Sequence, residues 1–294
     1  MGYAINADFL EDLAQHFKSE LVGYGYTLSG AESVQELGIK FFNVQRRLVL
    51  PVPRTVHEAD SFNCPPDLQV GLELVRDKIT RGLDLRPHLS TRILDSDYND
   101  PLLNDWGIHH LHLGTVIDGR GFVDRTGPVL FAHFTDTEAY LVNVIEHGAW
   151  SQQDMVRALH RSWPEAFARY RLNVLGLAVE LSDNDVRRLR AGHVQTFVEV
   201  EPGVVYAPIG GGYMTNGVSF EVLRTADNYI ARARACELAL RKNIENVISK
   251  LLEAGVTVGP QLAFELRYDS ASGTLFAYEP ILRVSVLLED KGTA

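Results

Sequence analysis

Histidine side chains are the groups of this chain best placed to do chemistry. Five of the ten histidines lie within residues 105–150. Around them are three short runs rich in β-branched and aromatic residues, bounded by turn-forming Gly and Asp, at about 108–114, 129–135 and 139–147. Such runs are typical of antiparallel strands. Side chains alternate between the faces of a strand, which places His110 and His112 together on one face.

One chemistry open to these groups is metal-free cleavage of an RNA phosphodiester bond. The reaction needs a base that takes the proton of the 2′-hydroxyl, an acid that protonates the leaving oxygen, and a cation that stabilises the charge on phosphorus. Histidine and arginine supply all three near neutral pH. The catalytic set predicted on this basis is His110, His112, Arg125 and His147.

A metal site is a second interpretation of the same strands. An HxH pair on a strand can present two imidazoles to one ion, and a neighbouring strand can add a third. The predicted ligands are His110, His112 and His133, with His147 as an alternative third ligand and Asp105 or Asp124 as a further one. This interpretation implies a divalent metal cofactor and a metal-dependent hydrolase, whereas the ribonuclease needs no cofactor.

A structural role for the histidines is the alternative to both chemistries. Imidazoles that pack on a partly buried sheet can simply hydrogen-bond to their neighbours. The protein would then be a non-enzymatic binding or regulatory protein whose histidine-bearing face recognises a partner. A second copy of the chain is one such partner, because the longest predicted helix, 225–254, offers a surface for a homodimer.

The charge balance limits the partners of the chain. Its formal net charge is −10 at pH 7 and its pI is near 5.5. This excludes broad, nonspecific binding to nucleic acid, which requires a basic face. A site for RNA or the ribosome must therefore be local or be completed by a partner. The candidate RNA-binding surface is the basic stretch 76–92, with Arg76, Arg81 and Arg86 as contacts, although a solvated helix face also explains it.

Apolar runs are short throughout the sequence. None reaches the roughly 18 residues of a membrane-spanning helix, and the N-terminus lacks a basic segment followed by an apolar one. We therefore predict a soluble, cytoplasmic protein that does not bind membranes. The two cysteines, Cys64 and Cys236, match no metal-ligand spacing and are expected to be reduced, buried thiols.

Helices precede and follow the histidine-bearing strands. Apolar spacing predicts helices at 6–22 and 30–47, one that begins at Asp67, one after a Ser151–Asp154 capping box, a short one at 165–171, and the long one at 225–254. Further strands are predicted at 195–200, 203–209, 218–224, 261–268, 274–279 and 281–288. The glycine run 210–212 is predicted to form a hairpin loop, because no phosphate-loop spacing follows it.

The order of these elements predicts an α+β protein of two domains. Residues 1–175 form a helical domain that ends in a small antiparallel sheet with the histidine cluster. Residues 176–294 form a β-rich domain crossed by the long helix. A chain of 294 residues is long enough for two domains of common size.

Helices, three antiparallel strands with Arg and His near their ends, and a further helix follow one another over about residues 68–165. This order resembles that of RelE-like toxin ribonucleases, in which a basic residue precedes one of the last two strands and a polar residue follows the next. Arg125 and His147 have these two positions here. The resemblance implies RNA cleavage on translating ribosomes. Members of that family are small and basic, whereas this chain is long and acidic, and residues 176–294 have no counterpart there.

Overall fold

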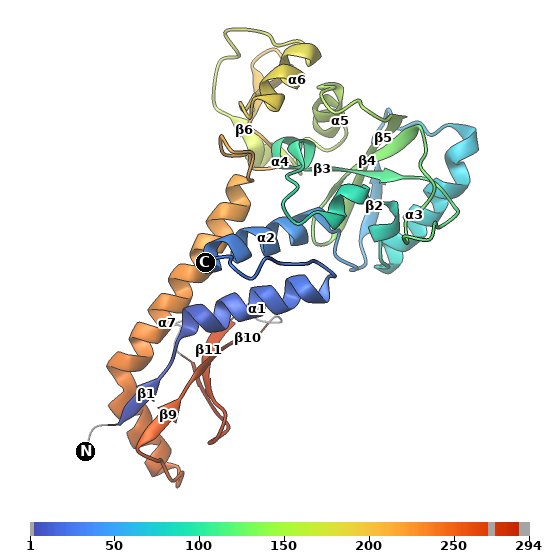
Figure 1. Ribbon diagram of the computed structural model, residues 1–294. Coiled ribbons are helices and arrows are strands. Elements are labelled where there is room, and N and C mark those ends of the chain that lie inside the picture. Colours follow the sequence, from blue (N-terminus) through green and yellow to red (C-terminus); the bar gives the residue numbers. More distant parts are fainter. Residues whose placement is uncertain (1–2, 270–273, 288–294) are drawn as a thin grey trace. The chain divides into compact units, whose positions relative to one another are not determined.

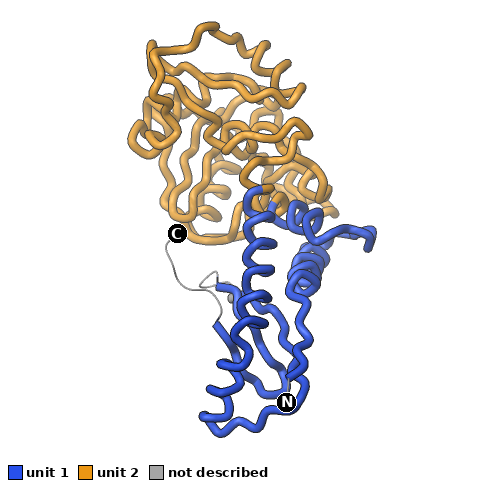
Figure 2. The backbone as a smooth tube through the Cα atoms, turned by 90° about the vertical axis from the view of Figure 1, so that its left-hand side faces the viewer, with its two compact units in different colours: residues 1–42, 224–294 blue, residues 43–223 orange. Residues whose placement is uncertain are grey.

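The computed structural model describes residues 3–269 and 274–287. It confirms the α+β fold class, with helices near the N-terminus, several small sheets and one long helix. Contacts group the chain into two compact units: unit 1, residues 1–42 with 224–294, and unit 2, residues 43–223 (Figure 2). The predicted division into 1–175 and 176–294 differs from these contact units and stays a prediction about independently folding parts. Within the described ranges, no helix combines the length and the apolar character that crossing a membrane requires.

Unit 1 combines helices with two small sheets. Its elements are β1 (Ala4–Asn6), α1 (Phe9–Gly23), the first part of α2 (Val34–Arg47), most of α7 (Phe220–Glu253), β9 (Gln261–Ala263), β10 (Glu265–Asp269), β11 (Thr274–Glu279) and β12 (Val284–Leu287). β1 pairs in parallel with β9, and β10, β11 and β12 form an antiparallel sheet (Figure 1). Phe17 and Phe41 bring α1 and α2 together, with ring centroids 5.1 Å apart.

Helix boundaries in unit 1 differ from the periodic pattern for local reasons. α1 begins at Phe9, not at residue 6, because residues 4–6 pair with β9 as a strand. The side chain of Asp8 caps it by accepting a hydrogen bond from the backbone N of Glu11 (3.0 Å). α7 begins at Phe220, so the predicted strand 218–224 is wrong. The predicted strand 261–268 divides into β9 and β10, and residue 288 of the last predicted strand lies outside the described residues.

A four-stranded sheet forms the centre of unit 2. Its strands, in spatial order, are β2 (Thr55–Glu58), β5 (Glu138–Glu146), β4 (Pro128–Phe134) and β3 (Ile108–His112). The antiparallel strands β3, β4 and β5 confirm the three predicted runs. β2 pairs in parallel with β5 and was missed, because Pro51 and Pro53 make the segment before it look irregular.

β5 carries one extra residue opposite β4. Phe131 pairs with Asn143 and Ala132 pairs with Leu141, which leaves Val142 between the two pairs. A bulge of this kind reverses the alternation of side chains beyond it. Val142 packs with α5, whereas Val144, two residues later, packs on the opposite side with α3.

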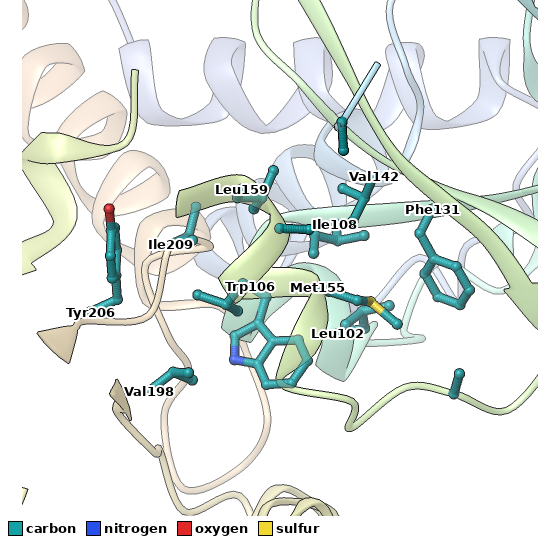
Figure 3. Close-up of a cluster of buried hydrophobic side chains, with 14 of the residues drawn as sticks. Leu102, Trp106, Ile108, Phe131, Val142, Met155, Leu159, Val198, Tyr206 and Ile209 are labelled. Carbon is teal, nitrogen blue, oxygen red and sulfur yellow. The ribbon is translucent and has the colours of Figure 1, made fainter. Parts of the chain in front are cut away.

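Helices cover both faces of this sheet (Figure 1). On one face, α3 (Gln69–Arg81) packs through Leu72, Val75 and Ile79, as its apolar spacing predicts. On the other face, α4 (Pro101–Trp106) and α5 (Asp154–Ser162) contribute to a second apolar cluster (Figure 3). Trp106 of α4 and Met155 of α5 are among the buried residues of this cluster, together with residues of β3 and β4.

The rest of unit 2 contains a small sheet, a further helix and short 3₁₀ helices. The sheet has the order β6 (Arg171–Leu172), β8 (Val204–Tyr206), β7 (Val198–Glu201). The 3₁₀ helices of the described chain are η1 (Pro66–Leu68), η2 (Arg86–His88), η3 (Thr91–Leu94) and η4 (Ala168–Tyr170), of which η4 replaces the predicted helix 165–171. Of the two cysteines, Cys236 is buried as predicted, and Cys64 is only partly buried.

Helix α6 (Asp183–Ala191) was not predicted and follows the predicted domain boundary at residues 175 and 176. Its first turn is held by a capping box, in which Ser182 and Asp185 each accept a hydrogen bond from the other's backbone N. The box predicted at Ser151 does not form, because α5 begins only at Asp154 and has Gln153 as its N-cap. The same sequence pattern therefore marks a helix start at one place and not at the other.

Candidate functional site

A close backbone contact positions the start of β3. The backbone N of Gly210 donates a hydrogen bond to the carbonyl oxygen of Asp105 (2.8 Å), and that of Gly212 donates to Asn104 (2.9 Å). A Cβ atom at residue 210 would lie 2.2 Å from the carbonyl oxygen of Leu103, so only glycine fits. The predicted hairpin loop is thus a turn that packs against α4, which leads directly into β3.

Three histidines and a tryptophan come together beside β3. His110 and His112 lie on one face, with ring centroids 6.4 Å apart. His147 lies just beyond β5, and its ring centroid is 6.2 Å from that of His110 and 5.6 Å from that of His112. The ring centroid of Trp150 is 4.6 Å from that of His110 and 4.8 Å from that of His147. The structure therefore brings together three of the four residues predicted to be catalytic.

Arg125, the fourth predicted catalytic residue, is exposed and lies close to this group. Its Nη1 donates a hydrogen bond to the carbonyl oxygen of Leu89 (3.0 Å), and its Cζ lies 5.5 Å from the ring centroid of Phe122. Burial is the main reason that the pKa of His112 is lowered to about 3, and the positive charge of Arg125 lowers this pKa further. Arg125 thus acts on the histidines through its charge.

His110 and His112 are neutral at pH 7. Burial lowers the pKa of His110 below its ordinary value of 6.5, with His147 and Arg125 adding to the shift and Asp100 opposing it. His112 is 4% exposed, and its Nδ1 has no hydrogen-bond partner among the described atoms. Both imidazoles are therefore unprotonated and can accept a proton, and the lowered pKa makes each a weaker base than a free histidine.

A cavity of about 460 Å³ opens beside these rings. His110, His147 and Trp150 line one part of it, and Asp100, the N-cap of α4, lines another. Three arginines complete the charged lining: Arg92, Arg187 and Arg190. The volume lies within the range of small-molecule sites, roughly 300–1,000 Å³. A small organic ligand therefore has room in this cavity.

Arg190 of α6 forms hydrogen bonds with Asp105 and with Trp150, which lines the cavity. Its Nε and Nη2 donate hydrogen bonds to Oδ2 of Asp105 (3.0 and 2.7 Å), and its Nη1 donates to the carbonyl oxygen of Trp150. The Arg190 and Asp105 side chains are 6% and 0% exposed. Burial raises the pKa of Asp105, and the charge of Arg190 opposes that rise. This buried ion pair fixes the backbone that carries Trp150.

His133, Asp105 and Asp124, the other predicted metal ligands, are engaged by groups other than His110 and His112. The Nδ1 of His133 donates a hydrogen bond to the carbonyl oxygen of Gly107 (2.8 Å), and the His133 ring packs edge-on against Phe167. Asp105 is committed to its ion pair, and Oδ1 of Asp124 accepts from the backbone N of Val116 (2.9 Å). Within residues 3–269 and 274–287, no group of three His, Cys, Asp or Glu side chains is arranged to hold an ion. The set His110, His112 and His133 stays a prediction that this geometry does not favour.

The arginines of the predicted RNA-binding surface are engaged with carboxylates. The ion pairs are Arg76 with Glu58 and Glu73, Arg81 with Asp77, and Arg86 with Asp84. Their positive charges are therefore offset locally. Arg92, at the end of the same basic stretch, is the member that reaches the cavity.

Sequence reasoning did not assign Trp150, Arg187 or Arg190 to the site. Trp150 could have been noticed, because it follows His147 by three residues in a turn. Arg187 and Arg190 are three residues apart on α6, and the Ser182–Asp185 pattern indicated that helix. Nothing in the sequence, however, indicates that α6 lies beside β3.

Comparisons of the chain with protein-family models, with curated proteins and with solved structures found no match. The RelE-like resemblance of residues 68–165 stays a hypothesis that rests on the order of elements, here α3, β3, β4, β5 and α5 with α4 inserted. Function must therefore be argued from the site itself.

Acid is expected to destabilise unit 2 through its buried histidines. Burial lowers the pKa of His109 and His112 to about 3 and that of His133 to about 4, from an ordinary value of 6.5. Below pH 6.5 the unfolded chain binds protons that the folded chain does not, so stability falls as the pH drops toward 4. Each histidine contributes at most roughly 1.4 kcal/mol per pH unit.

Urea denaturation at several pH values between 7.5 and 5 measures this slope. His133→Gln keeps a donor for the Gly107 carbonyl oxygen and should reduce the slope by the contribution of one histidine. A wild-type stability that does not vary over this range would contradict the neutral, buried state of these imidazoles.

Proposed function

We propose that unit 2 cleaves RNA at the His110–His147 cavity without a metal ion. The observation that carries this proposal is the pair of imidazoles, 6.2 Å apart, that line one cavity together with arginines. Two groups at this separation can contact different oxygens of the same phosphate group. The cleaved bond would thus lie between a base and an acid in a positively charged setting.

His110 is the base in this mechanism, because burial keeps it neutral. It takes the proton of the 2′-hydroxyl, and the 2′-oxygen then forms a bond to phosphorus. The bond between phosphorus and the 5′-oxygen breaks, and His147, which is exposed, protonates that oxygen. The products are a 2′,3′-cyclic phosphate and a free 5′-hydroxyl. Arginine side chains stabilise the charge that develops on the phosphate oxygens.

Cleavage of a labelled RNA oligonucleotide in the presence of EDTA tests this mechanism. His110→Ala and His147→Ala should each lower the rate by about 100-fold, the usual contribution of a general acid or base. His57→Ala is the matched control, because His57 lies on β2, at the other edge of the sheet, and pairs with Glu138. Because the pKa of His110 is lowered, the acidic limb of kcat/KM should lie below pH 6.5.

Two outcomes would contradict the proposal. Loss of cleavage in EDTA would favour the metal-dependent hydrolase that the HxH pair suggested. Equal rates for the wild type and the two histidine variants, with unchanged melting temperatures, would show that the imidazoles have no part in cleavage.

A non-enzymatic binding protein is the second candidate. The observation that favours it is the lowered pKa of both His110 and His112, because imidazoles that are weak bases are suited to hydrogen bonding with a ligand. In that case the cavity would bind RNA or another phosphate-bearing ligand without cleaving it, alone or as a homodimer through α7. Absence of cleavage by the wild type, together with ligand binding that His110→Ala weakens, would support this candidate.

A further inference from the structure

We propose that Arg92 and Arg187 are the phosphate-binding residues of the cavity. They would hold a phosphate group of a mononucleotide or of an RNA backbone, in place of the predicted surface at Arg76, Arg81 and Arg86. Arginine suits this role because its planar guanidinium donates two parallel hydrogen bonds to phosphate oxygens. The RNA source rests on the proposed function, whereas the phosphate-binding role does not.

The charges around the cavity leave these two arginines available. Arg190 is neutralised by Asp105, with which it shares a buried ion pair. In the described part of the chain, neither Arg92 nor Arg187 has a carboxylate within ion-pair distance. Asp100 is the one carboxylate of the lining, and its Oδ1 already accepts hydrogen bonds from the backbone N atoms of Leu102 and Leu103. The two arginines and Asp100 give the lining a charge of +1 when its histidines are neutral.

Hydrogen bonds to its backbone and stacking of its guanidinium on an aromatic ring hold Arg92 in place. The hydroxyl of Ser90 accepts from the backbone N of Arg92 (3.2 Å), and Nη1 of Arg47 donates to its carbonyl oxygen (3.1 Å). The guanidinium Cζ lies 5.5 Å from the centroid of the Tyr98 ring. A guanidinium stacked on an aromatic ring keeps its N–H groups directed outward in its own plane, where they can reach an anion.

Arg187 approaches from a different element. It lies on α6, one turn before Arg190, and its Nη2 donates a hydrogen bond to Oδ1 of Asn184. Since Arg190 anchors α6 to Asp105 and to Trp150, the helix cannot turn without breaking a buried ion pair. Arg92 and Arg187 therefore present two cations to one cavity from elements that are both fixed.

Ser90 and Ser151 also line this cavity. Hydroxyls donate hydrogen bonds to phosphate oxygens in addition to the arginine contacts. The imidazoles of His110 and His147 lie on the same lining, so a phosphate held by the two arginines would be within the reacting site and not beside it.

Titration calorimetry with adenosine 5′-monophosphate, adenosine and inorganic phosphate tests the assignment on the full chain. We expect the monophosphate to bind at least about 10-fold more tightly than adenosine, and inorganic phosphate to compete with it. Arg92→Gln and Arg187→Gln should each weaken binding about 10-fold, and the double variant should bind the monophosphate no better than adenosine. Arg188→Gln is the matched control, because Arg188 is the neighbour of Arg187 but pairs with Asp185 and is not part of this lining.

A 2′-O-methyl RNA oligonucleotide, which lacks the attacking hydroxyl, identifies the source of the phosphate. If only the oligonucleotide binds in a way that depends on Arg92 and Arg187, the site belongs to the RNA backbone. If only the monophosphate does, the site belongs to a mononucleotide. In the second case the ribonuclease proposal fails while the phosphate site stands. If neither probe binds the wild type, or if Arg188→Gln weakens binding as much as the other variants, the assignment is wrong. Melting temperatures of all variants control for misfolding.

Discussion

Gly71→Ala is expected to lower the stability of unit 2 by about 3 kcal/mol or more. A Cβ atom at this position would lie 1.7 Å from the carbonyl oxygen of Leu113 and 2.6 Å from its carbonyl carbon. Both atoms belong to backbone, so no side-chain rotation relieves the clash. α3 would have to move away from the end of β3 and expose Leu72 and Val75, which are buried beneath it.

Gly23→Ala is the control for this substitution. Gly23 is also helical, has no strained backbone, and would have no neighbouring atom within 4 Å of an added methyl group. Alanine favours helix over glycine by up to about 1 kcal/mol, so this variant should be neutral or slightly more stable. Urea denaturation followed by circular dichroism measures both. Similar midpoints for the two variants would show that α3 does not pack against Leu113 as described.

Arg190→Met is expected to destabilise unit 2 by about 3–5 kcal/mol, because it leaves the Asp105 carboxylate buried without its partner. The Asp105 side chain is 0% exposed, and the second oxygen, Oδ1, already has no hydrogen-bond partner among the described atoms. The double variant Asp105→Leu, Arg190→Met removes both charges and should recover most of the loss, since apolar side chains can replace a buried ion pair.

Arg188→Met is the matched control on the same helix. Arg188 is 71% exposed and pairs with Asp185 at the surface, so its loss should change stability little. Thermal denaturation of the four proteins decides the matter. A double variant no more stable than Arg190→Met alone would mean that the hydrogen bond to Trp150 and the contact with Trp106, and not the ion pair, carry the stability.

Periodicity predicted the long and regular elements, because their burial follows directly from side-chain spacing. The strands near the histidines and the long helix are examples; β3, β4, β5 and α7 all lie within a few residues of their predicted bounds. α4 was missed because it is only 6 residues long and follows an Asp- and Asn-rich segment that is typical of a loop. α6 was missed because its sequence is mostly polar and charged, with Val186 and Leu189 as its large apolar residues, so apolar spacing does not indicate it.

The candidate site could be predicted only in part. Alternation along one strand indicated that His110 and His112 share a face, because that relation is local. The position of His147 depends on the bulge in β5, and that of Arg187 depends on how α6 packs. The local pattern encodes neither of them. The basic stretch 76–92 was noticed, but the structure shows that its nearby carboxylates engage Arg76, Arg81 and Arg86 and that Arg92 alone of these four lines the cavity.

Because of the bulge in β5, the assembly of the histidine cluster depends on the number of residues in that strand. Before Val142, even-numbered positions of β5 face α5; after it, odd-numbered positions do, and Ile145 is the first of these to pack there. His147 continues this odd series and so reaches the side of His110. Substitutions within the strand preserve this parity, whereas the loss of a single residue between Leu141 and Asn143 would invert it. Relatives of this chain can therefore vary in composition along β5 and keep the cluster, but an insertion or deletion of one residue there would separate its members.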